Sequence, residues 1–387
     1  MRRNRLIFLG LWLASLAGIS FRGGPVTYGL FTFLTLLPVL SLFYLFAVFL
    51  AFKVYQHLEG RDLVAHHPHP FLFILENETF FPFSCVKVNL FSDYSAISGQ
   101  DDGAEYELLP HTGIRNEATL LCRYRGEYDV GVESIEIVDF LKLFRVRYRN
   151  PSTVKARVQP DLIRLNELKS VDIQLLTSAD SPSSDAVPDA VVRDYVPGDD
   201  ARFIEWKATA RSGSLKTRVR TGETQQGIGI LMGTERTTQE PAGYLPVENK
   251  LIETTLALAW FFAADHTPVT LGLKTSSFKK LTVDRPEKFG SCYEALSSLV
   301  FTDLQKETDL LQEAGRDPAF LKCRIVFIVI KDLSAEALSL AAALNRSNVS
   351  AVVCKIVTDP EEQLPVLSLP RTQLIAVPAE KPLEEVL

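Results

Sequence analysis

The sequence lacks the short motifs by which most enzyme sites are recognised. It contains no G-x-S-x-G nucleophile elbow, no Walker phosphate loop, no H-E-x-x-H zinc motif and no G-x-G-x-x-G dinucleotide fingerprint. Histidine is also scarce, and His266, one of six, falls at a predicted helix end, where it caps rather than catalyses. The sequence therefore predicts no catalytic residue and no cofactor.

The chain also lacks an excess of basic residues and a pattern of paired cysteines. Its 41 Lys and Arg are outnumbered by 47 Asp and Glu, and the net charge of −6 argues against general binding to nucleic acid. An odd number of widely spaced cysteines without a C-x-x-C pair indicates free, buried thiols in a reducing compartment, rather than disulfides or a zinc site. The five cysteines are Cys85, Cys122, Cys292, Cys323 and Cys354.

Charged residues are nearly absent from the N-terminal part of the chain. Leu6 to Ser20 and Val26 to Phe52 carry no charge, and Arg22 is the only charged residue between these two runs. Because about 20 apolar residues span a bilayer, the second run is long enough and the first is slightly short. A cleaved signal peptide would fit the first run alone, but the second run directly after it favours a two-helix transmembrane hairpin. We assign residues 1–57 to this hairpin and expect residues 6–52 to contact lipid.

The basic residues predict the orientation of the hairpin. Arg2, Arg3 and Arg5 before the first run, with Lys53 and Arg61 after the second, outweigh the single arginine between the runs. By the positive-inside rule both ends then lie in the cytoplasm. The sequence thus predicts a multi-pass protein of the inner (cytoplasmic) membrane whose soluble domains face the cytoplasm, in agreement with the free thiols.

Residues 58–165 have the patterns of a small β-sandwich. Cys85 to Leu90 alternates between apolar and polar positions, and Ala118 to Asp139 is rich in Tyr, Val and Ile between glycines. The apolar phase slips between Val132 and Ile135. This slip predicts a β-bulge or a change of strand.

Three histidines, His66, His67 and His69, lie close together near the start of this domain. A metal site is one interpretation of such a cluster. The alternating prolines Pro68 and Pro70 favour instead an exposed, extended linker just outside the membrane.

Residues 166–225 are predicted to be a linker followed by a compact polar module. Ser178 to Ser184 is rich in Ser, Asp and Pro and predicts a flexible connection. In the module, Arg193 to Arg220, Pro197-Gly198 predicts a turn and Asp199 or Asp200 predicts the N-cap of a short helix. Gly213 then ends that helix in a left-handed conformation, before a strand with one basic face.

The polar module has two interpretations. In the first, its charges form a structural ion-pair web that fixes the neighbouring domains relative to each other. In the second, Asp199, Arg202, Glu205 and Arg211 form the polar site of a hydrolase-type enzyme. Basic residues beside Glu205 favour an ionised, paired carboxylate, so we favour the structural web. Its residues are Arg193, Tyr195, Gly198, Asp199, Arg202, Glu205, Trp206 and Arg211.

From residue 226 to 387, apolar strands alternate with amphipathic helices. This alternation predicts a parallel sheet covered on both faces, a doubly wound α/β domain, so the whole chain combines a membrane anchor, an all-β domain and an α/β domain. Function in such a sheet lies at the carboxyl ends of the strands, here Gly233 to Thr238 and Lys331-Asp332. The predicted strands are Gly227–Met232, Val269–Leu273, Arg324–Ile330, Ser350–Val357 and Gln373–Val377, and the helices are Glu248–Ala264, Cys292–Phe301 and Ala335–Leu344.

The polar module also carries a resemblance to a known family. An Arg-x-Tyr-x-x-Gly-Asp run, an acidic residue before Trp, Ala-Arg, and a Leu before alternating basic residues resemble the motif of the bacterial family called domain of unknown function fifty-eight. A second run, Arg125 to Tyr128 followed by Gly131 and Asp139, resembles another motif of that family, although Phe140 and Lys142 replace its Pro and Gly. The positions that match the first motif are Arg193, Tyr195, Gly198, Asp199, Arg202, Trp206, Ala210, Arg211 and Leu215.

The resemblance implies a C-terminal domain similar to von Willebrand factor A domains, which often bind Mg²⁺ through Asp-x-Ser-x-Ser after the first strand. Carboxylate and hydroxyl oxygens are hard ligands that suit this ion. The corresponding run here is Gly233-Thr234-Glu235-Arg236-Thr237, in which Gly233 replaces the Asp and Glu235 replaces the first Ser. Arg236 places a cation nearby, and only Thr237 keeps a ligand-type side chain. We predict that this degenerate motif binds no metal, with a Glu235–Asp332 carboxylate pair as the remaining route to a cation site.

The resemblance also implies a role in protein assembly. Its members are expected to work with a MoxR-type AAA+ ATPase in assembling or maturing proteins at the membrane. We therefore expect a membrane-anchored protein-interaction factor rather than an enzyme. Its partner-binding edge is predicted to consist of Gly233, Glu235, Thr237 and Asp332.

Overall fold

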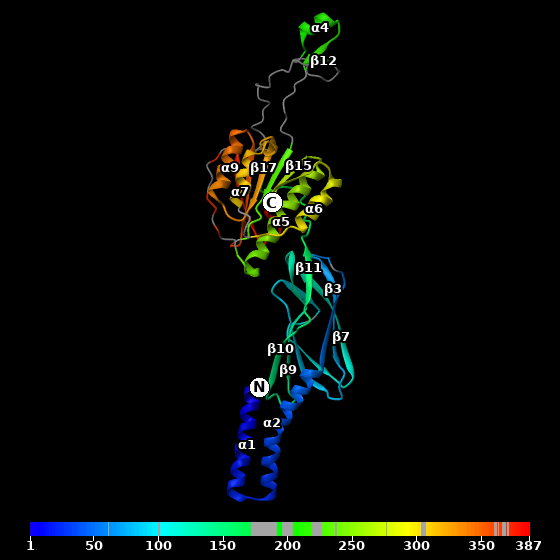
Figure 1. Cartoon of the computed structure of the whole chain (residues 1–387), viewed down its shortest axis with the longest axis vertical. Helices are drawn as coiled ribbons and strands as arrows, with labels where there is room; N and C mark the ends of the chain where they lie inside the picture. Colours follow the sequence, from blue (N-terminus) through cyan, green and yellow to red (C-terminus); the bar gives the residue numbers. More distant parts are fainter. Residues whose placement is uncertain are drawn as a thin grey trace. The chain divides into compact units, whose positions relative to one another are not determined.

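The structure is a computed structural model of the whole chain (Figure 1). It describes residues 1–387 except 61, 100, 172–191, 196–203, 219–226, 237, 276, 303–306, 360, 361, 363, 366–368 and 370. The chain forms two compact units, Met1–Asp161 and Leu162–Leu387. The predicted flexible connection from Ser178 to Ser184 lies outside the described residues.

The N-terminal unit begins with two long apolar helices, α1 (Arg2–Arg22) and α2 (Pro25–Ala51). Both are long and apolar enough to cross a membrane, a property that signal sequences share. They contact each other, because the Trp12 indole donates to Thr35 Oγ1 (3.1 Å) and packs on Phe31. The helical hairpin ends at Ala51 rather than at residue 57, since a strand begins directly after it.

Eleven strands follow in the N-terminal unit. They form three sheets with the orders β1-β3-β7-β5, β10-β9-β4-β6 and β2-β11-β8. The strands are β1 (Phe52–Leu58), β2 (Asp62–Val64), β3 (Pro68–Asn77), β4 (Phe83–Leu90), β5 (Ser95–Ser98), β6 (Ala104–Leu108), β7 (Thr112–Cys122), β8 (Gly126–Val130), β9 (Val132–Val138), β10 (Arg145–Arg149) and β11 (Val154–Gln159).

Alternating apolar side chains of these sheets form one core. Phe71 and Phe73 of β3 and Val86 and Val88 of β4 are all buried in it. The phase slip before Ile135 is a bulge, because the pairing of β9 with β4 shifts register between Asn89 and Leu90. Fully buried, alternating strand positions therefore explain the all-β prediction for this part of the chain.

The histidine cluster is largely exposed, as predicted, but it does not lie in a linker, which corrects the sequence prediction. Pro68 to Asn77 is strand β3, paired along its length with β7 and, beyond His69 and Pro70, also with β1. His69 Nε2 lies 3.1 Å from the backbone N of Val64, and His67 Nε2 lies 3.3 Å from Asp161 Oδ1. Pairing of Pro68, His69 and Pro70 with β7 thus makes the extended backbone part of the fold.

The second family-like motif forms a tight turn between β9 and β10, although its Pro and Gly are replaced. The buried Asp139 carboxylate accepts hydrogen bonds from the backbone N–H of Phe144 (2.7 Å) and Leu141 (3.3 Å), and from the Ser41 hydroxyl of α2. Lys142 N donates to the Asp139 carbonyl (2.9 Å). Lys142 adopts φ 56°, a left-handed conformation that glycine would enter more easily. The aspartate therefore holds the turn without the glycine.

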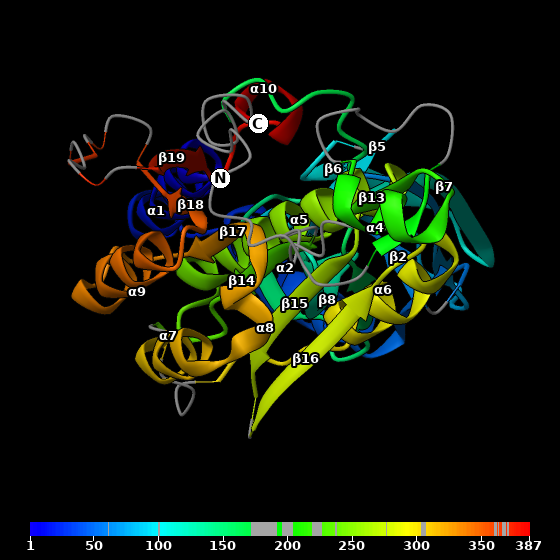
Figure 2. The same cartoon turned by 90° about the horizontal axis from the view of Figure 1, so that it is seen from above.

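The C-terminal unit contains a six-stranded sheet with the order β16-β15-β14-β17-β18-β19, which Figure 2 shows from above. All neighbours are parallel except β16, which is antiparallel to β15. The strands are β14 (Gly227–Met232), β15 (Val269–Lys274), β16 (Phe278–Val283), β17 (Cys323–Ile330), β18 (Ser350–Val357) and β19 (Thr372–Pro378). The helices are α5 (Pro241–Ala264), α6 (Phe289–Ser297), α7 (Glu307–Arg316), α8 (Pro318–Leu321), α9 (Ala335–Arg346), α10 (Leu383–Val386) and the 3-10 helix Pro286–Lys288.

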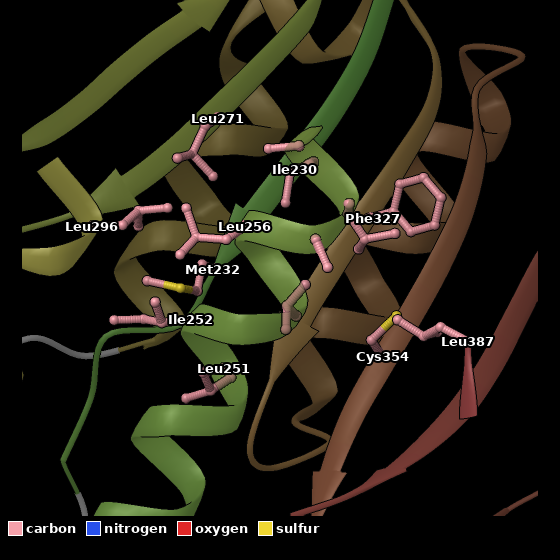
Figure 3. Packing of buried hydrophobic residues seen from close by; sticks show 14 of the residues in the cluster. Ile230, Met232, Leu251, Ile252, Leu256, Leu271, Leu296, Phe327, Cys354 and Leu387 are labelled. Atoms are coloured by element: carbon pink, nitrogen blue, oxygen red, sulfur yellow. The ribbon is translucent and has the colours of Figure 1, made fainter. Parts of the chain in front are cut away.

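Helices cover both faces of this sheet, as a doubly wound fold requires. In β17, Phe327 points to the face covered by α5 and α6, whereas Ile328 points to the face covered by α7, α8 and α9. Figure 3 shows Leu256 of α5 beside Leu271 and Met232, in the same buried cluster as Phe327. The doubly wound arrangement predicted from the apolar strands is thus present. The strand order reverses between β14 and β17, because β15 and β16 follow β14 on one side and β17 to β19 lie on the other.

Several boundaries differ from the sequence prediction. The α5 helix begins at Pro241 instead of Glu248, α6 covers Phe289–Ser297 instead of Cys292–Phe301, and strand β16 and helix α7 were not predicted. Leu162, Leu165, Leu168 and Val171 pack on the core of the α/β unit, so the β-sandwich does not extend to residue 165. This segment therefore belongs to the second unit because its apolar side chains are buried there, and not because it forms a helix or a strand.

Candidate functional site

The polar module forms a short hairpin with one helix. Strands β12 (Val192–Asp194) and β13 (Lys216–Arg218) pair antiparallel, and Tyr195 N donates to the Leu215 carbonyl (2.9 Å). The helix α4 (Trp206–Ser212) begins later than predicted, because Glu205 rather than Asp199 or Asp200 precedes its first turn. Gly213 ends it with φ 68°, which confirms the predicted left-handed end.

The structure brings only part of the predicted polar web together. Arg193 lies in β12 opposite Thr217, while Gly198, Asp199 and Arg202 lie outside the described residues. In α4, Arg211 is exposed and Trp206 is 67 % exposed. The web and its hydrolase alternative therefore both stay predictions.

The carboxyl edge of the six-stranded sheet is the second predicted site. Here β14 and β17 lie side by side, and Gly233 N donates to the Val329 carbonyl (2.9 Å). Glu235 pairs with Thr302 through a β-bridge, and Asp332 follows the end of β17. Thr237 lies outside the described residues. Gly233, Glu235 and Asp332 are thus placed at one edge, as the strand order predicts.

A third carboxylate at this edge, Glu307, was not predicted from the sequence. It is the first residue of α7, and its backbone N–H donates to Glu235 Oε2 (3.0 Å). A Cβ atom at Gly233 would lie only 3.2 Å from both Cδ and Oε2 of Glu307. The Glu307 carboxyl group therefore occupies space that a side chain at position 233 would need. The only sequence signal for it was the acidic first turn of an amphipathic helix.

The environment of Glu307 favours its neutral form. Burial and, to a smaller extent, the charges of Asp332 and Glu235 raise the pKa of its carboxyl group to about 8, while Lys331 opposes the shift. Within the described part of the chain, its buried Oε1 atom has no hydrogen-bond partner. The Glu307 carboxyl group is therefore mainly protonated at neutral pH.

Arg236, which lies between two ligand positions of the von Willebrand motif, is held by other residues. Its guanidinium group makes two hydrogen bonds to Glu248, from Nε to Oε1 (2.6 Å) and from Nη2 to Oε2 (2.9 Å). It also lies over the ring of Tyr244, 3.9 Å from the centroid. This bidentate, stacked arrangement fixes Arg236 against α5.

The residues at this edge do not fit a von Willebrand-type magnesium site. Gly233 offers no side-chain oxygen, and Glu307 in its place is held in its protonated form. Among the described residues, no group of three His, Cys, Asp or Glu side chains is arranged to hold a metal ion. The predicted absence of a metal, with the Glu235–Asp332 pair as the remaining route to a cation site, stays a prediction.

Strand order, the antiparallel β16 and the loops at the carboxyl edge define a doubly wound domain of the von Willebrand factor A-like class. Residues 191–376 match the family described as "Protein of unknown function DUF58". This match confirms the resemblance seen in the polar module.

Similarities to solved structures are distant. A von Willebrand factor type A protein from Catenulispora acidiphila is 14% identical, with a TM-score of 0.27, over 37% of this chain and 35% of that one. The CARDB domain of the PF1109 protein from Pyrococcus furiosus is 13% identical, with a TM-score of 0.19, over 28% of this chain and 91% of that one. No curated protein matches the chain. The chain spans about a third of the length of the von Willebrand factor protein. Because these TM-scores are low, the fold is assigned from the strand order of the sheet.

Proposed function

We propose that this chain is a membrane-anchored interaction factor whose α/β domain contacts a protein partner at the carboxyl edge of its sheet. The observation that carries the proposal is the combination of an apolar and an acidic surface there. Val300, 68 % exposed, lies two residues before Thr302, which pairs with Glu235. An exposed apolar side chain beside carboxylates is typical of a protein-binding surface. On binding, the partner would bury the apolar side chain and form ion pairs or hydrogen bonds with the carboxylates.

The proposal includes direct recognition without a bridging metal. In a von Willebrand-type site a bound cation completes its coordination with a partner carboxylate. Here the space over Gly233 holds the Glu307 carboxyl group instead, and Glu235 and Asp332 remain as acceptors. Such an edge suits a partner that offers basic or hydrogen-bond-donating groups.

The N-terminal helices supply the anchor in this proposal. Their length and composition suit a transmembrane hairpin, and the arginines at the start of α1 favour a cytoplasmic location for both ends. The α/β domain would then face the cytoplasm from the inner membrane. There it would meet a MoxR-type AAA+ ATPase, the partner that the family resemblance implies.

Photo-crosslinking in native membranes tests the proposal. A benzophenone amino acid replaces Val300 in the full chain, and a matched variant carries it at His266, which is exposed at the opposite, amino edge of the sheet. We expect Val300 to capture a specific protein, identified by mass spectrometry as an ATPase of this type, and His266 not to capture it. Capture of no protein, or of the same proteins from both positions, would contradict the proposal.

A further inference from the structure

A group of large apolar side chains is exposed at one end of the β-sandwich. They come from three separate loops, those between β3 and β4, β6 and β7, and β9 and β10. We call this group the apolar rim, and it consists of Phe80 (82 % exposed), Phe81 (55 %), Leu109 (66 %) and Phe140 (43 %). Single exposed apolar residues are normal on a soluble surface, but large apolar side chains gathered from three loops indicate a binding surface.

Hydrogen bonds hold two of these loops together. Asn77 Nδ2 donates to the carbonyls of Phe81 (2.8 Å) and Leu109 (3.0 Å). His111 N donates to the Thr79 carbonyl (3.2 Å), and the His111 ring packs on Phe80 with 4.7 Å between centroids. The rim is therefore a fixed part of the sandwich.

The same loops contact the middle of α2. Tyr44 OH donates to the Pro82 carbonyl (2.6 Å), and the Tyr44 ring packs edge-on against Phe140, 5.4 Å between centroids. Ser41, one turn earlier in α2, donates to the buried Asp139 carboxylate. The apolar rim thus lies beside the segment from Ser41 to Tyr44.

The start of α1 reaches the same turn. Asn4 Nδ2 donates to the Leu141 carbonyl (3.2 Å), and Arg5 Nε donates to the Leu143 carbonyl (2.6 Å). The charge-free run of α1 begins at the next residue, Leu6. Both arms of the hairpin therefore meet the sandwich at the turn between β9 and β10.

The length of α2 sets the depth of these contacts. About 20 helical residues cross the hydrocarbon core of a bilayer, so a span that starts at Val26 ends near Leu45. Ser41 and Tyr44 fall within the last turns of that span. Beyond them the outward side of α2 stays apolar as far as Leu50, which is 68 % exposed. Loops that touch α2 at Ser41 and Tyr44 must then reach the membrane surface.

We propose that the apolar rim inserts into the lipid interface, so that the sandwich rests in the membrane on its own loops as well as on the hairpin. Aromatic side chains favour this layer. The exposed Arg2, Arg3 and Lys142 lie beside the contacts of the start of α1 and of the β9–β10 turn, where they suit anionic headgroups. This inference rests on the hairpin being embedded, but it adds a lipid-binding surface that is separate from the partner-binding edge.

Nitroxide labelling of the full chain in proteoliposomes tests the inference. The label is placed on Phe80→Cys and, as a second rim position, on Leu109→Cys. A matched control at Asp93→Cys lies beyond the opposite end of β4. Phe33→Cys, exposed on α2, reports whether the hairpin itself is embedded. The native thiols are all buried, so the introduced cysteines are labelled selectively.

Collisions with oxygen, which dissolves in lipid, are compared with collisions with a water-soluble nickel complex. We expect the ratio of oxygen to nickel collisions at both rim positions to exceed that at Asp93 several-fold, and to approach that at Phe33. Rim labels that behave like Asp93 while Phe33 is embedded overturn the inference and leave the anchor intact. Rim labels shielded from both reagents indicate a protein partner and also overturn it. Exposure of Phe33 to nickel would refute the anchor and the inference together.

Discussion

Substitution of Glu307 by Gln is expected to remove a pH-dependent loss of stability from the α/β unit. The carboxyl group has a pKa of about 8 in the folded chain, against an ordinary value of 4.5. Between these values the folded protein keeps a proton that the unfolded chain has released. Folding stability therefore falls as the pH rises from 4.5 to 8, and above pH 8 the full penalty is present. Glutamine is neutral at every pH and has nearly the same shape.

The size of the effect follows from the width of this pH window. Each unit of pKa difference corresponds to about 1.4 kcal/mol. At pH 7, about 2.5 units above the ordinary value, the wild-type chain loses on the order of 3 kcal/mol that the Glu307→Gln variant keeps. Near pH 4.5 the two proteins should differ little, because the wild-type carboxyl group is then protonated in the folded state and largely so in the unfolded state.

Urea unfolding of the full chain in detergent measures this difference. Trp260 of α5 packs on Phe289, 5.0 Å between ring centroids, and reports on the α/β unit once Trp12 and Trp206 are replaced by Phe. Asp309→Asn is the matched control, because Asp309 is an exposed acid in the same first turn of α7.

The control should show a different sign and a different pH profile. Asp309→Asn removes a favourable helix-dipole interaction, so it should lower stability by about 0.3–1 kcal/mol with little change between pH 5 and 8. The stabilities of wild type and Glu307→Gln should diverge over the same range. Parallel pH profiles for these two proteins would refute the reasoning that Glu307 is buried among like charges.

Three further outcomes are expected. Gly272→Ala should destabilise the α/β unit by about 1–3 kcal/mol in urea, because the new Cβ would lie 2.7 Å from Leu231 Cδ2 and 2.8 Å from Phe320 Cζ; a neutral result would mean that this core can relax. Asp139→Ala should lower the thermal stability of the N-terminal unit by about 1–3 kcal/mol, more than Ser41→Ala, since it leaves buried donors unsatisfied. Calorimetric titration with Mg²⁺ should give no micromolar binding, and such binding lost in Asp332→Ala would contradict the degenerate motif.

The parts of the fold predicted from the sequence were those that local patterns encode. The apolar run at β17 indicated a strand buried on both faces, and Gly213 indicated a left-handed helix end. The bulge near Val132 was visible as a slip in alternation. In each case the side chains that fix the structure are neighbours in the sequence.

The parts that were missed depend on distant contacts. Strand β16 reads Phe-Lys-Lys-Leu-Thr-Val and, as a partly exposed edge strand, has no apolar run. Glu307 belongs to the site only because α7 packs over the strand that precedes Gly233, a contact that spacing along the chain does not encode. Leu162 to Val171 is irregular, so its burial in the core of the α/β unit and the hydrogen bonds of Ser170 with Leu387 and Gln373 assign it to the second unit.

The burial of the five cysteines bears on how the protein withstands oxidation. All are buried, and desolvation raises the pKa of each thiol above its ordinary value. The thiolate is the form that attacks peroxides and disulfides, so these side chains react slowly on either side of a membrane. They would stay reduced in the periplasm as well as in the cytoplasm. The predicted orientation therefore rests on the N-terminal arginines, and the cysteines serve as small apolar side chains that resist oxidation.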